Sequence, residues 1–162
     1  MARNYWDEMG RGAEKGRHGP MPHQLSSELK LEELSSQYSV LKPALELSQL
    51  MSGLAHHRMY ALHSIGALGV IELTAPGRAA KIYRGLKRLD VSPSGTQYYL
   101  IHSTLDVKHS SAWNSEIIAP LVKAGSKNAR WIAEGALMRL IAGAACFEAY
   151  RMHLAPSGVY LA

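Results

Sequence analysis

Hydrophobic residues recur at every third or fourth position along most of the chain, with polar residues between them. This spacing places the hydrophobic side chains on one face of a helix, as in the series Leu47, Leu50, Met51 and Leu54. The strict alternation that is typical of strands is hard to find in any segment. The pattern therefore predicts an all-α fold, a helical bundle in which short loops join mostly antiparallel neighbours.

Glycine and proline residues divide this pattern into separate helices. Gly10 and Gly12 predict a loop after the first helix, of which only the last turns are expected to be present. Pro43 suits the first turn of a helix, Pro76 is expected to separate two helices, and Pro120 is expected to end or kink one. The predicted helices cover residues 1–9, 22–34, 43–56, 58–73, 76–89, 96–119 and 126–154.

With 47% hydrophobic and 19% charged residues, the composition is that of an ordinary globular protein. The length of 162 residues suits a single domain, so one domain is expected over residues 1–162. The net charge is +5, but Lys and Arg never form a run longer than two. Nucleic-acid binding usually needs basic residues gathered on one face, so no nucleic-acid partner is expected. A mildly basic surface, or a cleft for anionic substrates, is the simpler interpretation.

Cysteine content and hydropathy predict the compartment. The single cysteine, Cys146, excludes an intramolecular disulfide and fits a reducing cytoplasm. The first ten residues contain Arg3, Asp7 and Glu8 and lack the apolar core of a signal peptide. Charged residues interrupt both of the most apolar stretches, so no membrane span is expected and the predicted location is cytoplasmic.

The segment from His102 to His109 carries the clearest candidate chemistry. If it is helical, His102, Asp106 and His109 fall at i, i+4 and i+7, within about 60° of one another on one face. Hydrophobic neighbours predict that much of this helix is buried, and a buried charge or imidazole without a partner is costly. Two imidazoles and a carboxylate suit iron, zinc or copper, and the alternative is a buried hydrogen-bonded network.

Two further groups of polar residues are candidates. Glu72 follows an apolar helical segment, and on that face it would be an acid with a shifted pKa, a paired ion or a metal ligand. Asp7 and Glu8 precede the glycine loop and His18 follows within it. From periodicity alone this second group is a weak signal, because acidic residues near a terminus are usually solvated.

Taken together, these motifs resemble the iron-containing redox enzyme family, which belongs to the haem-oxygenase-like diiron oxidases and oxygenases. The resemblance runs through nearly all of the chain, and the His-x-x-x-Asp-x-x-His spacing is its most specific part. The motifs that carry it are Asp7-Glu8-Met9-Gly10-Arg11-Gly12 with His18, Gly66-Ala67-Leu68-Gly69-Val70-Ile71-Glu72, His102-x-x-x-Asp106-x-x-His109, and Gly135-Ala136-Leu137-x-Arg139 continuing to Gly143, Phe147, Glu148, Tyr150 and Arg151.

The resemblance implies a haem-oxygenase-like helical bundle that binds two iron ions and uses O2 to oxidise a small organic substrate, amino-acid-like or fatty-acid-like. Arg139, Glu148 and Arg151 on the last helix are candidates to orient the imidazoles or to bind a substrate carboxylate, and the alternative for each is a salt bridge between helices. The metal ligands that the resemblance implies are Glu8, His18, Glu72, His102, Asp106 and His109.

One departure from the family pattern concerns the first helix. Family members carry a helix upstream of the glycine loop that supplies another glutamate ligand, and here only seven residues precede Glu8. We therefore expect a bundle without its first helix, with two irons, or one if the first site is incomplete.

We favour an enzyme, a non-haem diiron oxidoreductase, over a non-catalytic helical remnant or a protein with one structural metal such as zinc. Besides the small-molecule substrate, an electron donor and a second copy of the chain are candidate partners.

Overall fold

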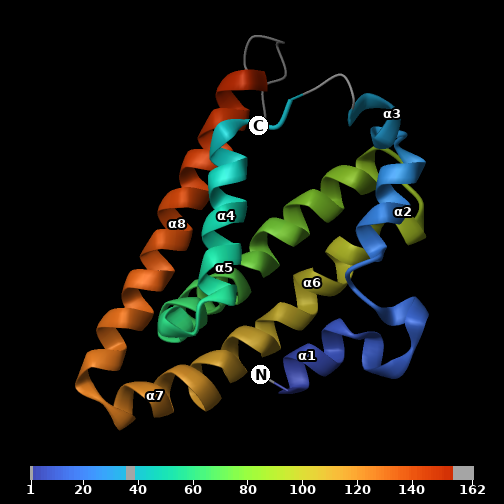
Figure 1. Cartoon of the computed structure of the whole chain (residues 1–162). Helices are drawn as coiled ribbons and strands as arrows, with labels where there is room; N and C mark the ends of the chain where they lie inside the picture. Colours follow the sequence, from blue (N-terminus) through green and yellow to red (C-terminus); the bar gives the residue numbers. More distant parts are fainter. Residues whose placement is uncertain (1, 36–38, 155–162) are drawn as a thin grey trace. The chain divides into compact units, whose positions relative to one another are not determined.

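The computed structural model describes residues 2–35 and 39–154, and every regular element within these ranges is a helix (Figure 1). The all-α prediction is therefore confirmed. Short 3-10 helices cover Gly10–Gly12, Glu14–Gly16 and Arg58–Tyr60, and a π-helical segment covers Trp113–Ile118. The α-helices are α1 (Ala2–Glu8), α2 (Met21–Glu28), α3 (Leu31–Ser35), α4 (Lys42–His56), α5 (Ala61–Arg88), α6 (Pro93–Ala112), α7 (Ala119–Ala124) and α8 (Ser126–Leu154).

The chain divides into two compact units, and each consists of two separate stretches of sequence. Unit 1 contains Met1–Tyr38 and Ile71–Ile117, and unit 2 contains Ser39–Val70 and Ile118–Ala162. Helix α5 contributes its first part to unit 2 and the remainder to unit 1. All six implied metal ligands belong to unit 1. The expectation of one domain over the whole chain stays a prediction.

In unit 1, a hydrophobic cluster and a helix cap set the position of α6. Leu25 of α2, Leu86 of α5 and Val91 form the cluster, and Tyr99 of α6 packs against it. The Ser92 hydroxyl accepts a hydrogen bond from the backbone N–H of Gly95 at 3.1 Å, which satisfies a free donor of the first turn. Helix α6 therefore begins at Pro93, three residues earlier than predicted, and carries the His-x-x-x-Asp-x-x-His segment.

Proline affects two helices differently from the prediction. Pro76 lies inside α5, which continues as one helix from Ala61 to Arg88, so the prediction of two helices separated at Pro76 is wrong. A proline removes only one helical hydrogen bond, here to the carbonyl of Glu72, and the surrounding turns retain theirs. One helix was predicted over residues 96–119, but α6 ends at Ala112 and the π-helical segment follows it. Pro120 does not end this helix and lies instead in the first turn of α7.

The predicted helix over residues 22–34 is also divided. Helix α2 ends at Glu28, and Lys30 takes a positive φ of 53° before α3 begins at Leu31. A residue in this left-handed conformation cannot continue a right-handed helix. The helices predicted over residues 43–56 and 126–154 agree with α4 and α8 to within a residue.

In unit 2, α4 lies beside α8, and α7 packs on the same helix (Figure 1). The backbone of α5 meets that of α8 at two glycines. A Cβ atom on Gly66 would collide with the carbonyl oxygen of Ile132, and one on Gly135 would collide with that of His63. The sequence left open whether Gly66 marks close helix packing or room for a ligand. The structure shows close packing.

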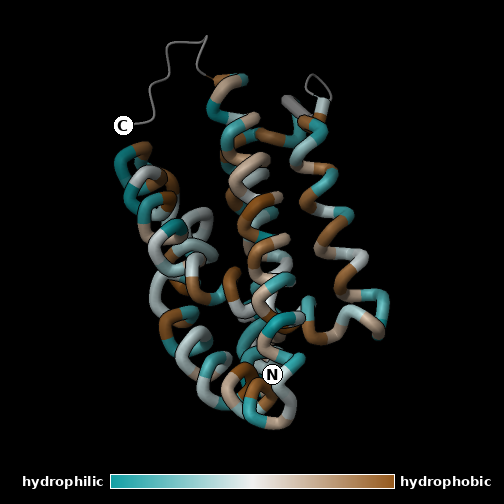
Figure 2. The backbone as a smooth tube through the Cα atoms, turned by 90° about the vertical axis from the view of Figure 1, so that its left-hand side faces the viewer, coloured by the Kyte–Doolittle hydropathy of each residue, from teal (hydrophilic) through white to brown (hydrophobic). Residues whose placement is uncertain are grey.

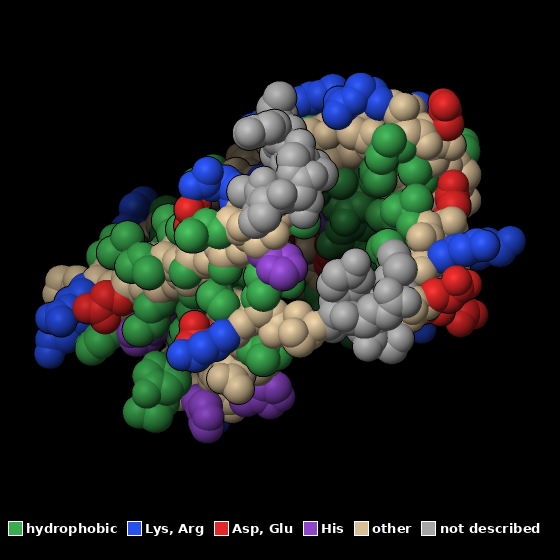
Figure 3. Space-filling view, turned by 90° about the horizontal axis from the view of Figure 1, so that it is seen from above, with side chains coloured by type: hydrophobic (Ala, Val, Ile, Leu, Met, Phe, Trp, Pro, Cys, Tyr) green, Lys and Arg blue, Asp and Glu red, His purple; other side chains and the backbone are tan. Residues whose placement is uncertain are grey.

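Hydrophobic and polar residues are mixed along the helices (Figure 2). Within residues 2–35 and 39–154, none of the helices has the length and apolar content that crossing a bilayer requires. On the face drawn in Figure 3, Lys and Arg side chains stand in separate groups with Asp and Glu side chains among them.

Candidate metal centre

A tight reversal of the chain after α1 brings His18 beside Glu8. Gly10, Arg11 and Gly12 all have positive φ values of 68°, 53° and 87°, which glycine adopts without a Cβ penalty. The backbone N–H of His18 then donates to the carbonyl of Glu8 at 3.0 Å. A Cβ atom on Gly10 would also collide with the backbone of Gly16 and Arg17, so the reversal requires this glycine.

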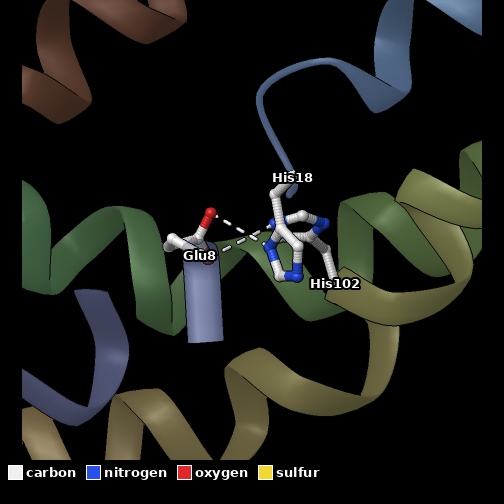
Figure 4. Close-up of side chains that lie close together, drawn as sticks. All are labelled: Glu8, His18 and His102. Atoms are coloured by element: carbon white, nitrogen blue, oxygen red, sulfur yellow. Dashed lines mark ion pairs between the residues drawn. The ribbon is translucent and has the colours of Figure 1, made fainter. Parts of the chain in front are cut away.

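The first group of candidate ligands contains Glu8, His18 and His102, whose ligand atoms all lie within 4.8 Å of one another. One carboxylate oxygen of Glu8 lies 3.0 Å from Nδ1 of His18, and the other lies 3.7 Å from Nε2 of His102 (Figure 4). Nδ1 of His102 donates to the carbonyl of Tyr98 at 2.7 Å, and because a carbonyl only accepts, Nε2 is left unprotonated for a metal in the neutral ring. We call these three residues the first triad.

The second group contains Glu72, Asp106 and His109, whose ligand atoms also lie within 4.8 Å of one another. Nδ1 of His109 lies 3.5 Å from an Asp106 oxygen and 3.6 Å from a Glu72 oxygen. Asp106 and His109 are only 3% and 5% exposed. We call these three residues the second triad. The structure thus brings all six implied ligands into two groups, and each group includes at least one residue of α6.

Helix α1 supplies two polar contacts that the sequence reasoning missed. Asp7 lies 3.0 Å from Nε2 of His109, and the amide of Asn4 donates to Glu72 at 2.6 Å. Arg11 in turn donates to the other oxygen of Asp7 at 2.6 Å. A carboxylate that accepts the Nε2 proton of His109 leaves its Nδ1 free to face the second triad. The sequence feature that could have indicated these contacts is the spacing of Asn4, Asp7 and Glu8 at i, i+3 and i+4, which places them on one helical face.

Replacing Asp7 by alanine is expected to weaken metal binding by the second triad by about 10- to 100-fold, because the His109 ring loses the partner that orients it. Competition titration with a metallochromic chelator measures this affinity, and the visible spectrum of the Co²⁺-loaded chain reports the ligand geometry. Glu46→Ala removes an exposed carboxylate of α4 and is the matched control. Unchanged affinity and an unchanged Co²⁺ spectrum in Asp7→Ala would show that Asp7 does not position His109.

Burial and ion pairing act in opposite directions on the carboxyl groups of the site. Burial raises the pKa of Asp106 to about 6, and the imidazoles of His102 and His109 only partly oppose this. Burial also acts to raise the pKa of Glu8, but the two imidazoles that face its carboxylate, those of His102 and His18, outweigh burial and lower the pKa. For His102, burial acts to lower the pKa, but the facing carboxylate of Glu8, the hydrogen bond to the Tyr98 carbonyl and the charge of Asp106 together raise it.

The metal-free chain is expected to be more stable near pH 5 than near pH 7.5. The raised pKa values of Asp106 and His102 mean that the folded state binds their protons more tightly than the unfolded state does. For each of the two groups, the stability that its protonation adds is complete below its pKa in the unfolded chain and is lost as the pH rises through its pKa in the folded chain. Differential scanning calorimetry should show a Tm that falls by a few degrees over this range and a smaller fall in Asp106→Asn. A flat Tm would contradict the raised pKa values.

The six residues fit a pair of metal ions. Nδ1 of His18 and Nδ1 of His109 are buried and make no hydrogen bond to any residue that the structure describes, although each faces carboxylate oxygens. Buried polar atoms of this kind are rare without a partner, and a bound cation would supply it. Three carboxylates and three imidazoles are ligands for iron and equally for zinc.

The candidates on α8 lie in unit 2. Arg151 and Glu148 pair with each other at 2.6 Å within α8, and both side chains are exposed. This salt bridge lies within one helix, whereas the alternative to a functional role was a salt bridge between two helices. The guanidinium of Arg139 folds over Gly143, where it would meet an added Cβ. Their roles at the metal site stay predictions.

Two groups of imidazole and carboxylate side chains in an all-α chain define a helical protein with a candidate metal centre. A sequence model of a family described as iron-containing redox enzymes matches residues 1–144, and the chain belongs to this family. The matched stretch contains all six candidate ligands and ends before Glu148 and Arg151. No curated protein and no solved structure matches the chain.

Proposed function

We propose that this protein is a non-haem diiron oxidase or oxygenase that uses O2 to oxidise a small organic substrate. The observation that carries the proposal is the pair of triads arranged around α6 in a chain of an iron-containing redox family. Each triad supplies three ligands, which leaves coordination positions open on an ion that prefers five or six. A bound pair of Fe²⁺ ions would supply electrons for the reduction of O2.

The charge of the six residues supports a pair of divalent ions. Two Fe²⁺ ions bring a charge of +4, and the three carboxylates of Glu8, Glu72 and Asp106 bring −3. The near balance matters because an uncompensated charge in a buried site is costly. The residues behind the ligands hold this arrangement: Asp7 orients His109, Asn4 fixes one Glu72 oxygen, and the carbonyl of Tyr98 fixes the tautomer of His102.

Anaerobic titration of the full chain with Fe²⁺, followed by O2, tests this proposal. Close to two irons per chain, with an O2-dependent change in the visible spectrum, is the expected result. A parallel titration with Zn²⁺ measures binding without redox chemistry, since zinc cannot change its oxidation state. One iron or none, or Zn²⁺ binding with no O2-dependent change in the iron sample, would favour a structural metal site or a non-catalytic remnant. The electron donor is a further prediction.

A further inference from the structure

Helix α8 is apolar on two opposite faces. Its buried residues include Ile132, Gly135 and Cys146, and they lie on the face that packs within unit 2, where α4, α5 and α7 contact the helix. Leu137 and Ile141 fall on the opposite face by helical periodicity, and 56% and 69% of their surfaces are exposed. Apolar residues on both sides are typical of a helix that is covered on both sides. The outward face of α8 therefore has the composition of an interface.

The outward face is free of charge over its middle part. From residue 135 to residue 147 the sequence has one charged residue, Arg139, and its guanidinium folds over the buried Gly143 on the inward face. The exposed apolar residues of this stretch, which we call the α8 patch, are Leu137, Met138, Leu140, Ile141, Ala144 and Ala145. A contiguous apolar patch of this kind commonly marks a site of protein association.

Residues of the outward face recur at alternating intervals of three and four. The series is Arg130, Glu134, Leu137, Ile141, Ala144, Glu148 and Arg151. This is the spacing of the a and d positions of a coiled coil, in which two helices pack side by side. Its apolar members lie in the middle and its charged members at the two ends. When two copies of such a helix pack in antiparallel order, the a positions of one face the d positions of the other.

Charge selects one register for an antiparallel pair. In this register Leu137 lies opposite Ile141 of the second copy. The same register brings Arg130 opposite Glu148 at both ends of the pair, because a twofold axis repeats each contact. A shift by one heptad in one direction places Glu148 opposite Leu137, and a shift in the other direction places Arg130 opposite Ile141. Both shifts set a charge against an apolar residue, which is costly.

We propose that two copies of this chain associate through the α8 patch, with the two α8 helices antiparallel in this register. Met138 and Leu140 then lie near the twofold axis, each beside the same residue of the second copy. Glu134 faces Ala144 and keeps Arg130 of its own copy as its partner at 2.8 Å. A pair of single helices is a small interface, so the expected Kd is of order 10 μM. This association goes beyond the proposed function and does not depend on it.

Sedimentation equilibrium of the full chain tests the proposal at concentrations from about 1 to about 300 μM, on both sides of the expected Kd. The average mass should rise from that of one chain toward that of two. Ile141→Lys places an ammonium group at the centre of the patch and should weaken the association by at least about 100-fold. The mass of one chain at every concentration of the unchanged protein would overturn the proposal, and so would unchanged association of Ile141→Lys.

The matched control makes the same kind of change at an apolar residue of unit 1. Leu89 is 73% exposed, close to the exposure of Ile141, and Leu89→Lys should associate as the unchanged chain does. Circular dichroism and thermal melting at low concentration show whether both variants fold. An equal loss of association in folded Leu89→Lys and Ile141→Lys would show an effect of added charge alone and overturn the assignment to the α8 patch.

Two charge reversals test the register. Arg130→Glu and Glu148→Arg each place like charges opposite each other at both ends of the pair, and each should weaken the association by about 3- to 30-fold. In an equimolar mixture, each variant supplies the charge that the other lacks, so the association should return to the strength of the unchanged chain. A mixture that associates no more strongly than either variant alone would overturn the antiparallel arrangement in this register.

Discussion

Replacing His109 by alanine is expected to lower the iron content from about two ions per chain to about one. The substitution leaves the second triad with the two carboxylates of Glu72 and Asp106 and no imidazole, while the first triad keeps all three ligands. A metal site that loses one of three protein ligands also loses the geometry that selects the ion. Iron analysis of anaerobically loaded protein, with far-ultraviolet circular dichroism to monitor helix content, measures the effect.

A buried histidine outside the triads provides the matched control. His63 is 7% exposed and pairs with Glu134 at 3.4 Å in unit 2, so His63→Ala also removes a buried, paired imidazole. We expect this variant to keep both irons. The reciprocal variant His102→Ala should lose the ion of the first triad only. Full iron content in His109→Ala, or an equal loss in His63→Ala, would contradict the assignment of His109 as a ligand.

Replacing Gly66 by alanine is expected to destabilise the fold by about 3 kcal/mol or more, although alanine is the better helix former. Helix propensity favours the substitution by at most about 1 kcal/mol. Against this, the new Cβ atom would collide with the backbone carbonyl of Ile132, which cannot move aside as a flexible side chain could. The clash therefore decides the sign, and urea denaturation should show a lower midpoint.

The same helix contains the control for this prediction. Gly77 also lies in α5, but an added Cβ atom there would meet nothing within 4 Å beyond its chain neighbours and the nearby backbone of its own helix. Gly77→Ala should therefore show the propensity effect alone and raise the stability by about 0.5–1 kcal/mol. Equal midpoints for Gly66→Ala and Gly77→Ala would mean that α5 and α8 do not approach as closely as the structure has them.

How much of the site could be predicted from the sequence differs between the candidate ligands on α6 and those around the glycine loop. The spacing of His102, Asp106 and His109 depends only on helical periodicity, so these residues were found without a structural template. Glu8 and His18 lie on either side of a glycine reversal that has no periodicity, so the sequence alone indicated them only weakly and the family resemblance implied their role as ligands. The loop geometry that joins them depends on positive φ values at successive residues.

The contacts of Asp7 and Asn4 were not predicted because they join residues far apart in the sequence. Asp7 meets His109 across 102 positions and Asn4 meets Glu72 across 68. Local patterns carry no information on such pairs. The wrong prediction of a helix boundary at Pro76 has another origin. A proline inside a helix costs about 3 kcal/mol on average, and the free energy gained from tertiary packing can exceed this cost.

The division of unit 1 into two stretches has a consequence for the order of events during synthesis. Glu8 and His18 leave the ribosome first, and the whole of Ser39–Val70, which belongs to unit 2, is made before Glu72 appears. At the usual rate of about 5–20 residues per second, the chain from His18 to His109 takes about 5–20 s to complete. Throughout this interval one carboxylate and one imidazole have no partners from α6 and form no complete site. Metal binding by the two triads would therefore be coupled to the completion and folding of unit 1. Until then, the two candidate ligands that are made first would be exposed to whichever metal ions the cell offers.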